Sequence, residues 1–227
     1  MPEAPLAVHA WPDGLAQALA DLRRAGMTVL SVPTPLTAHR TDARHAIRHA
    51  VQHTLAAFLD CPAASVALLS RPGQAPQVAA PGVESFHLSI SHLPDFSVAA
   101  ISLRGAVGVD VMAVDTQSLP DWANVAHDYL GPLAAKALQQ TPPHDRPAAF
   151  AHAWTALEAC LKCLGLGLTE WTPDLAARLQ QCTITSLTLP AGSCGVLAFQ
   201  PAAKGQHGVW PGLPLTPPAS SAGTRFR

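Results

Sequence analysis

Proline and glycine divide this chain into short segments, and their spacing limits the folds available to it more than any other feature. The 227 residues include 22 prolines and 15 glycines, which bound most of the apolar runs. These two residue types favour turns between helices and strands. No uncharged apolar run reaches the roughly 18 residues of a membrane-spanning helix, so we expect a globular protein that does not span a membrane.

Between these turns the segments follow a repeated order of helix and then strands. Apolar residues recur at helical spacing over residues 42–59, and extended patterns follow at 65–70, 86–89, 96–103 and 106–112. A second cycle has helical patterns at 121–140, broken near Gly131-Pro132, and at 148–164, then extended patterns at 182–189 and 194–199. This order predicts an α+β fold with mainly antiparallel sheets rather than a parallel doubly wound fold.

The same order predicts how the chain is divided. We expect an N-terminal half over residues 1–106 and a second half over residues 107–210. Residues 211–227 are rich in proline, serine and glycine and offer little to bury. They are expected to form a loose tail.

Charge and cysteine content exclude several classes of protein. Fourteen basic and fifteen acidic side chains give a net charge of -1, so no nucleic-acid or membrane partner is expected. The five cysteines are odd in number, and the C-x-x-C pair Cys160 and Cys163 lies within a helical pattern without a second pair at zinc-ligand spacing. Because the N-terminus also lacks a basic, apolar leader pattern, reduced thiols and a cytoplasmic location are expected.

One carboxylate interrupts an apolar strand pattern. Asp110 lies within Gly108-Val109-Asp110-Val111-Met112. Such a side chain either points to solvent from an edge strand or is held near the core by a cation or a metal ion. The sequence leaves both alternatives open.

The helical pattern at 148–164 carries two further charges beside its apolar face. Glu158 and Lys162 are four residues apart and therefore lie along one edge of that face. One alternative is an exposed i,i+4 ion pair, worth only about 0.3–0.5 kcal/mol. The other is a functional pair, because a strand aspartate and a helical glutamate can together offer oxygen ligands to Mg²⁺.

Taken in order, these motifs resemble the signature of the 4'-phosphopantetheinyl transferase superfamily. The set comprises Ser91-His92, Gly108-x-Asp110, and Trp154-x-x-x-Glu158-Ala159-x-x-Lys162 followed by Gly-Leu-Gly-Leu at 165–168. The chain length is similar to the larger monomeric, surfactin-synthetase-activating type. The resemblance implies two similar halves related by a pseudo-twofold axis, each with a helix packed on a small, mainly antiparallel sheet.

The resemblance also implies an activity and its partners. Proteins of this family transfer the 4'-phosphopantetheine arm of coenzyme A to a serine of an acyl or peptidyl carrier protein. They use Mg²⁺, for which Mn²⁺ can substitute. Asp110 and Glu158 would be the metal ligands, Glu158 the general base, and Lys162 the cation that stabilises the leaving group.

Further positions match residues that contact coenzyme A in this family. Ser91 and His92 would contact its phosphates, and phosphate oxygens would favour the protonated form of His92. Arg44 and Arg48 lie where the family carries basic residues for the nucleotide phosphate, although a solvated helix face is the alternative. Residues 73–76 are similar to a Gly-Lys-Pro turn of the family, but the lysine is missing.

Three departures from the family pattern motivate a second hypothesis. Met112 replaces an acidic residue, Leu157 replaces a lysine, and Ala134 stands where another acidic residue is expected. The chain could therefore be a degenerate member that binds coenzyme A or a carrier protein without efficient transfer. A hydrolase that uses Ser91 or a cysteine with a histidine is the third hypothesis, although no G-x-S-x-G motif is present.

Overall fold

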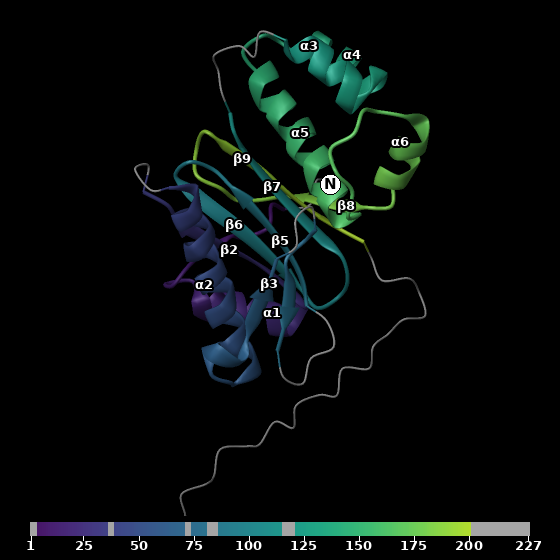
Figure 1. Cartoon of the computed structure of the whole chain (residues 1–227). Helices are drawn as coiled ribbons and strands as arrows, with labels where there is room; N and C mark the ends of the chain where they lie inside the picture. The colour runs from purple at the N-terminus through teal and green to yellow at the C-terminus, as the bar shows by residue number, and fades with distance from the viewer. Residues whose placement is uncertain (1–3, 36–38, 71–73, 81–85, 115–120, 201–227) are drawn as a thin grey trace, which may run out of the picture.

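The computed structural model describes residues 4–35, 39–70, 74–80, 86–114 and 121–200, which form two packed sheets with helices on their outer faces (Figure 1). The first sheet has the strand order β1-β2-β6-β5-β4-β3. All its pairs are antiparallel except β1 with β2. The bounds are β1 His9–Ala10, β2 Met27–Pro33, β3 Ala67–Leu69, β4 Gln77–Ala79, β5 His87–His92 and β6 Phe96–Ser102.

Two helices cover one face of this sheet, namely α1 Leu15–Ala25 and α2 Arg40–Leu59. Alternate residues of a strand point to opposite faces. Leu30, Ala99 and Ile101 therefore pack beneath the helices, in one core with apolar residues of α2. Their neighbours Val29, Val98 and Ala100 face the other way and form a second core with the second sheet.

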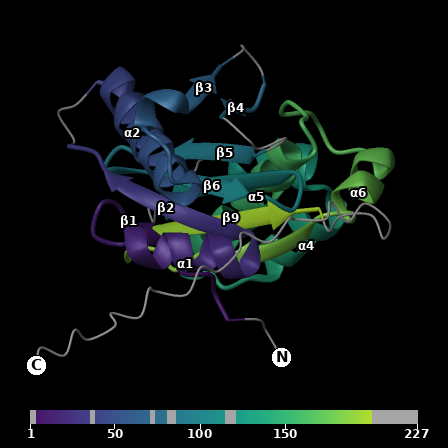
Figure 2. The ribbon, with the colours of Figure 1, turned by 90° about the horizontal axis from the view of Figure 1, so that it is seen from below.

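The second sheet is antiparallel and has the order β7-β9-β8. Its strands are β7 Val107–Ala113, β8 Thr183–Ser186 and β9 Ser193–Phe199. The helices of this part are α3 Trp122–Val125, continued by the π-helical turn Ala126–Leu130, then α4 Pro132–Gln140, α5 Arg146–Cys163 and α6 Pro173–Leu179. Helix α5 covers the outer face of the sheet, and α6 lies far from α2 in both views (Figure 2).

A glycine on β7 sets the distance between this sheet and α5. A Cβ atom added at Gly108 would lie 1.9 Å from the Ala159 carbonyl oxygen and 2.5 Å from the Cys163 nitrogen. The backbones of β7 and α5 therefore approach more closely than any side chain at this position allows. Asp110 follows two residues later on the same face of β7, which turns its side chain toward α5.

The predicted fold class is confirmed as α+β with mainly antiparallel sheets. The predicted helix break is also present, because Gly131 adopts a φ of 85° between the π-helical turn and α4. The boundary at residue 106 falls directly before β7, whereas the segment 211–227 lies outside the described residues. The two sheets differ in size, with six and three strands, and the pseudo-twofold relation remains a prediction.

Helix α1 and strand β2, within residues 15–33, were not among the predicted elements. A signal was available, because Leu15, Ala18, Leu19 and Leu22 recur at helical spacing. Gly26 then ends the helix in the left-handed conformation, with a φ of 67°. Within the described parts of the chain, no helix has the length and apolar character needed to cross a membrane.

Candidate active site

The site lies where the edge of β7 meets β5. Among the described residues β7 pairs in its sheet with β9 alone, so its other edge presents backbone groups without strand partners there. Two serine hydroxyls of β5 accept hydrogen bonds from backbone N–H groups of this edge. The Val109 N–H donates to Ser89 Oγ at 3.0 Å and the Val111 N–H to Ser91 Oγ at 3.3 Å. At this seam the two sheets are thereby joined by side-chain hydrogen bonds to backbone groups.

Asp110 lies at this seam, with 8% of its surface exposed. The Lys162 ammonium donates to Asp110 Oδ1 at 2.7 Å and to the Val109 carbonyl at 3.1 Å. The Ser91 hydroxyl donates to the same Oδ1 at 2.8 Å. Of the two alternatives that the sequence left open, the structure selects the carboxylate held near the core by a cation.

Glu158 and Lys162 do not form the simple i,i+4 pair. Within the described residues Lys162 pairs with Asp110, and Glu158 is half-buried one turn earlier on α5. Burial raises the pKa of Glu158 above its ordinary value, the negative charge of Asp110 raises it further, and Lys162 acts in the opposite direction. The two carboxyl groups therefore share one electrostatic environment, as a common ion site requires.

This donor set fits Mg²⁺. The ion is commonly held by one or two carboxylates, with water and substrate phosphates completing its shell. Asp110 and Glu158 supply two carboxylates whose repulsion a divalent cation would relieve. No cluster of three or more His, Cys, Asp or Glu side chains with metal-ligand geometry occurs in the described segments.

Two positions where the family often carries a charged side chain hold apolar residues that pack into clusters. Met112 stands where the family often carries an acidic residue, and it packs against an apolar cluster that includes Phe150 and Trp154. Leu157, at the position of the family's lysine, is buried against Leu161 in another apolar cluster. Met112 and Leu157 therefore both pack in apolar clusters that include residues of α5.

Positive charge gathers at the end of β5. The pKa of His92 is lowered, first by burial and then by the positive charges of Arg44, Arg40 and Lys162. Its Nδ1 lies 2.7 Å from Ser97 Oγ on β6. The positive charges of Arg44, Arg40 and Lys162 therefore act on one place, where they would favour a bound anion.

The two arginines predicted to bind phosphate differ in their surroundings. Arg48 donates to the Leu68 carbonyl and, at 2.6 Å, to Ser70 Oγ, so its guanidinium is engaged with β3 and the residue after it. Arg44 is exposed and close enough to His92 to affect its pKa. Arg40 also acts on His92. It was not among the predicted site residues, although its spacing of four residues from Arg44 places both on one face of α2.

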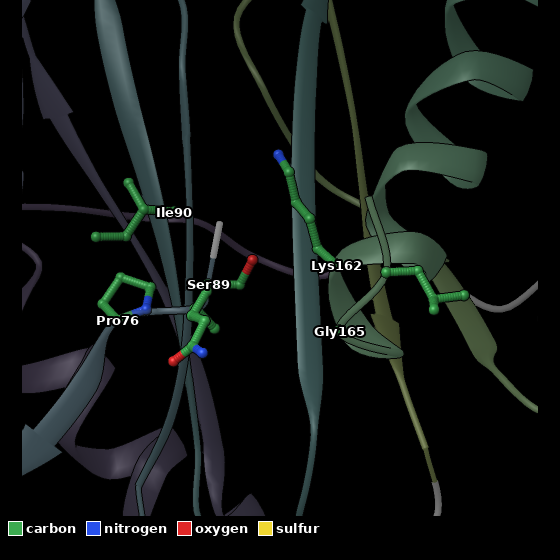
Figure 3. Close-up of a pocket in the computed structure, with 8 residues that line it drawn as sticks. Pro76, Ser89, Ile90, Lys162 and Gly165 are labelled. Atoms are coloured by element: carbon green, nitrogen blue, oxygen red, sulfur yellow. The ribbon is translucent and has the colours of Figure 1, made fainter. Parts of the chain in front are cut away.

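A cavity of about 240 Å³ opens beside Lys162. Figure 3 shows Pro76, Ser89 and Ile90 on one side and Lys162 and Gly165 on the other. Gln74, Ala75 and Leu166 complete the lining. The segment that resembles the Gly-Lys-Pro turn and the segment after α5 therefore meet at the same cavity.

The structure does not support the hydrolase hypothesis. Ser91 and His92 are adjacent on a strand and so point to opposite faces of the sheet, and the Ser91 hydroxyl donates to Asp110. Burial raises the pKa of Cys160 and of Cys163 to about 12. Thiols with such pKa values are poor nucleophiles.

Comparison with known proteins gives independent information on this region. Residues 106–207 match the sequence model of the 4'-phosphopantetheinyl transferase superfamily. The curated relatives include the 4'-phosphopantetheinyl transferase psf-1 of Bacillus pumilus, 28% identical over 108 residues, which are 48% of this chain and 44% of the relative. A 4'-phosphopantetheinyl transferase of Bacillus subtilis is 26% identical over 112 residues, 49% of this chain and 48% of the relative.

The match thus spans about half the length of these relatives. It is confined to part of the chain, yet the family segment begins just before β7 and runs through α5 to β9. These are the elements that carry the strand aspartate, the helical glutamate and the lysine. The segment that contains Asp110, Glu158 and Lys162, residues 106–207, is therefore similar to the 4'-phosphopantetheinyl transferase superfamily.

Proposed function

We propose that this protein transfers the 4'-phosphopantetheine group of coenzyme A to a serine hydroxyl of an acyl or peptidyl carrier protein. The observation that supports this most strongly is the convergence of three charged groups from distant parts of the sequence. Asp110 on β7 and Lys162 on α5 lie 2.7 Å apart, and the charge of Asp110 acts on Glu158. Of the three, Lys162 lines the cavity, and the positive charges of Arg40 and Arg44 act on the nearby His92.

The chemistry requires a base near the carrier serine. The serine oxygen attacks the phosphorus atom that carries the pantetheine arm, and the bond from that phosphorus to the adenosine bisphosphate breaks. Glu158 would accept the serine proton, and its raised pKa suits a group that must hold a proton during the reaction. Mg²⁺ bound by Asp110 and Glu158 would supply neutralisation of the pyrophosphate charge.

Lys162 and the cations at the end of β5 would act on the other side of the transferred group. The Lys162 ammonium lines the cavity and would stabilise the negative charge on the departing bisphosphate. His92 and Arg44 would bind nucleotide phosphate, and an arginine fork suits phosphate geometry. Bound phosphate would raise the pKa of His92 from its lowered value.

Intact-protein mass spectrometry tests this function directly. The purified protein, coenzyme A, Mg²⁺ and a panel of apo-carrier proteins should give carriers whose mass has increased by one phosphopantetheine. Chelation of the metal by EDTA should stop the increase. If no carrier in a broad panel is modified, the transferase proposal fails.

A specific observation favours one alternative, a family member that binds coenzyme A but does not transfer. Met112 and Leu157 are both packed into apolar clusters, so two positions that are often charged in the family are apolar here. Calorimetry separates the two hypotheses. For this alternative, affinity for coenzyme A should be almost the same with and without Mg²⁺, and Glu158→Gln should not change it.

Two arginines of α2 provide a matched pair of variants. Arg44→Ala should weaken coenzyme A binding by at least about tenfold, because a hydrogen bond to a charged group contributes about 1.5–3 kcal/mol. Arg48→Ala should instead lower the free energy of unfolding by about 1–2 kcal/mol, because it removes the donors to Leu68 and Ser70. Calorimetry measures the affinity of both variants for coenzyme A, and urea denaturation measures their stability. Equal losses of affinity in the two variants would contradict the different roles of Arg44 and Arg48.

A further inference from the structure

We propose that His49 and His53 on α2 form a binding site for a divalent transition-metal ion of the imidazole-preferring kind, such as Ni²⁺ or Zn²⁺. The site uses none of the groups assigned to phosphopantetheine transfer. It is therefore independent of the proposed function.

The helix places the two imidazoles side by side. His49 and His53 are four residues apart and both are exposed, so they lie one above the other on the solvent face of α2. Their ring centres are 4.1 Å apart and the ring planes are inclined by 43°. Two imidazoles that share one ion at about 2.0–2.1 Å have ring centres about 5 Å apart, which a small change in side-chain torsions provides.

Trp11 holds the pair from one side. Its ring centre lies 5.4 Å from that of His49 in an edge-to-face arrangement and 6.4 Å from that of His53. Trp11 itself packs against the core beneath α1 and α2, so its position is fixed by tertiary contacts. An indole in contact with both imidazoles reduces the number of rotamers available to them. The two side chains therefore lose less conformational entropy when the ion binds.

The ligand type decides which ions fit. Imidazole nitrogens suit Zn²⁺, Ni²⁺ and Cu²⁺, whereas Mg²⁺ prefers oxygen ligands. The described part of the chain places no third His, Cys, Asp or Glu with these two in metal-ligand geometry. Water would fill the remaining positions, so the site should bind more weakly than a structural zinc site with four protein ligands.

Ni²⁺ titration of the full-length protein without an affinity tag tests the proposal. Calorimetry should give one ion per chain, and the fluorescence of Trp11 should fall because the bound paramagnetic ion lies close to its ring. Even loss of an outer-shell partner commonly costs 10–100-fold in metal affinity. His49→Gln and His53→Gln should therefore each weaken binding by at least about tenfold, and millimolar Mg²⁺ should not compete.

Two further variants make the result specific. His45 is one turn from His49 on the same helix and exposed, so His45→Gln is the matched control and should bind Ni²⁺ like the parent. Trp11→Phe should retain the binding heat but lose most of the fluorescence change. The proposal is overturned if His49→Gln and His53→Gln bind as tightly as the parent, or if His45→Gln loses as much affinity as they do.

Discussion

Replacing Glu158 with glutamine is expected to reduce the rate of phosphopantetheine transfer by at least about 100-fold. Positioned general bases typically contribute 10²–10⁴-fold to a rate. Glutamine keeps the size of the side chain but cannot accept the serine proton, and it is a poor ligand for Mg²⁺. The measurement is the initial rate of carrier modification, followed by mass spectrometry at saturating coenzyme A and carrier.

The same substitution is expected to increase stability at neutral pH. The pKa of Glu158 is raised in the folded protein by burial and by Asp110, so the folded state binds this proton more tightly than the unfolded state. The contribution of such a group to stability is present below its ordinary pKa of 4.5 and is lost as the pH rises through the raised pKa. Glutamine has no such proton, so the advantage of the variant over the parent should grow between acidic and neutral pH.

Glu170 provides the control for both measurements. Its side chain is exposed and follows α5 in the sequence. Glu170→Gln should leave the transfer rate unchanged and, because the side chain is exposed, should change the free energy of unfolding by less than about 0.5 kcal/mol. If Glu158→Gln lowers stability at pH 7.5, the carboxylate is stabilised by its surroundings, Lys162 included, and the inference that burial and Asp110 destabilise its charged form is wrong.

Gly108→Ala is expected to lower the free energy of unfolding by about 3 kcal/mol or more. The added methyl group would lie 1.9 Å from the Ala159 carbonyl oxygen, which is helix backbone and cannot rotate aside. Overpacking typically costs 1–3 kcal/mol, and more where the neighbour cannot move. The urea midpoint of the variant at pH 7.5 gives the change.

The variant should also lose transferase activity beyond its loss of stability. Moving α5 away from β7 separates Lys162 and Glu158 from Asp110, and a displacement of about 1 Å in an active site can reduce the rate about 100-fold. Rates are compared at a temperature where both proteins are folded.

Gly167 is the matched control for this substitution, because a Cβ atom added there meets nothing within 4 Å. Gly167→Ala should change the free energy of unfolding by less than about 0.5 kcal/mol. Similar losses of stability in the two alanine variants would contradict the close packing of β7 on α5.

The local sequence predicted the elements that carry the site. Periodicity located α2 and α5 to within two residues at each end, and the apolar run around Asp110 predicted β7. Residues of one segment, such as Glu158 and Lys162, could be placed on one edge of a helix because helix geometry is fixed. The pattern of α1 was equally regular but carried no motif, and no helix was assigned there.

Contacts between segments could not be obtained in this way. Whether Lys162 pairs with Glu158 or with Asp110, 52 residues away, depends on how closely α5 packs on β7. The sequence also could not separate Arg44 from Arg48, because both lie on α2 and only the position of β3 decides which one is engaged.

The sequence by itself therefore determined the α+β class, the principal helices and strands of the site, and the identity of its charged residues. The tertiary structure alone decided that Asp110 is held by Lys162 and Ser91, that Arg40 and Arg44 lie near His92, and that His49 and His53 meet Trp11. The physical reason is that periodicity fixes the direction of a side chain within its own element. The partner of a charge is fixed only when two elements have packed together.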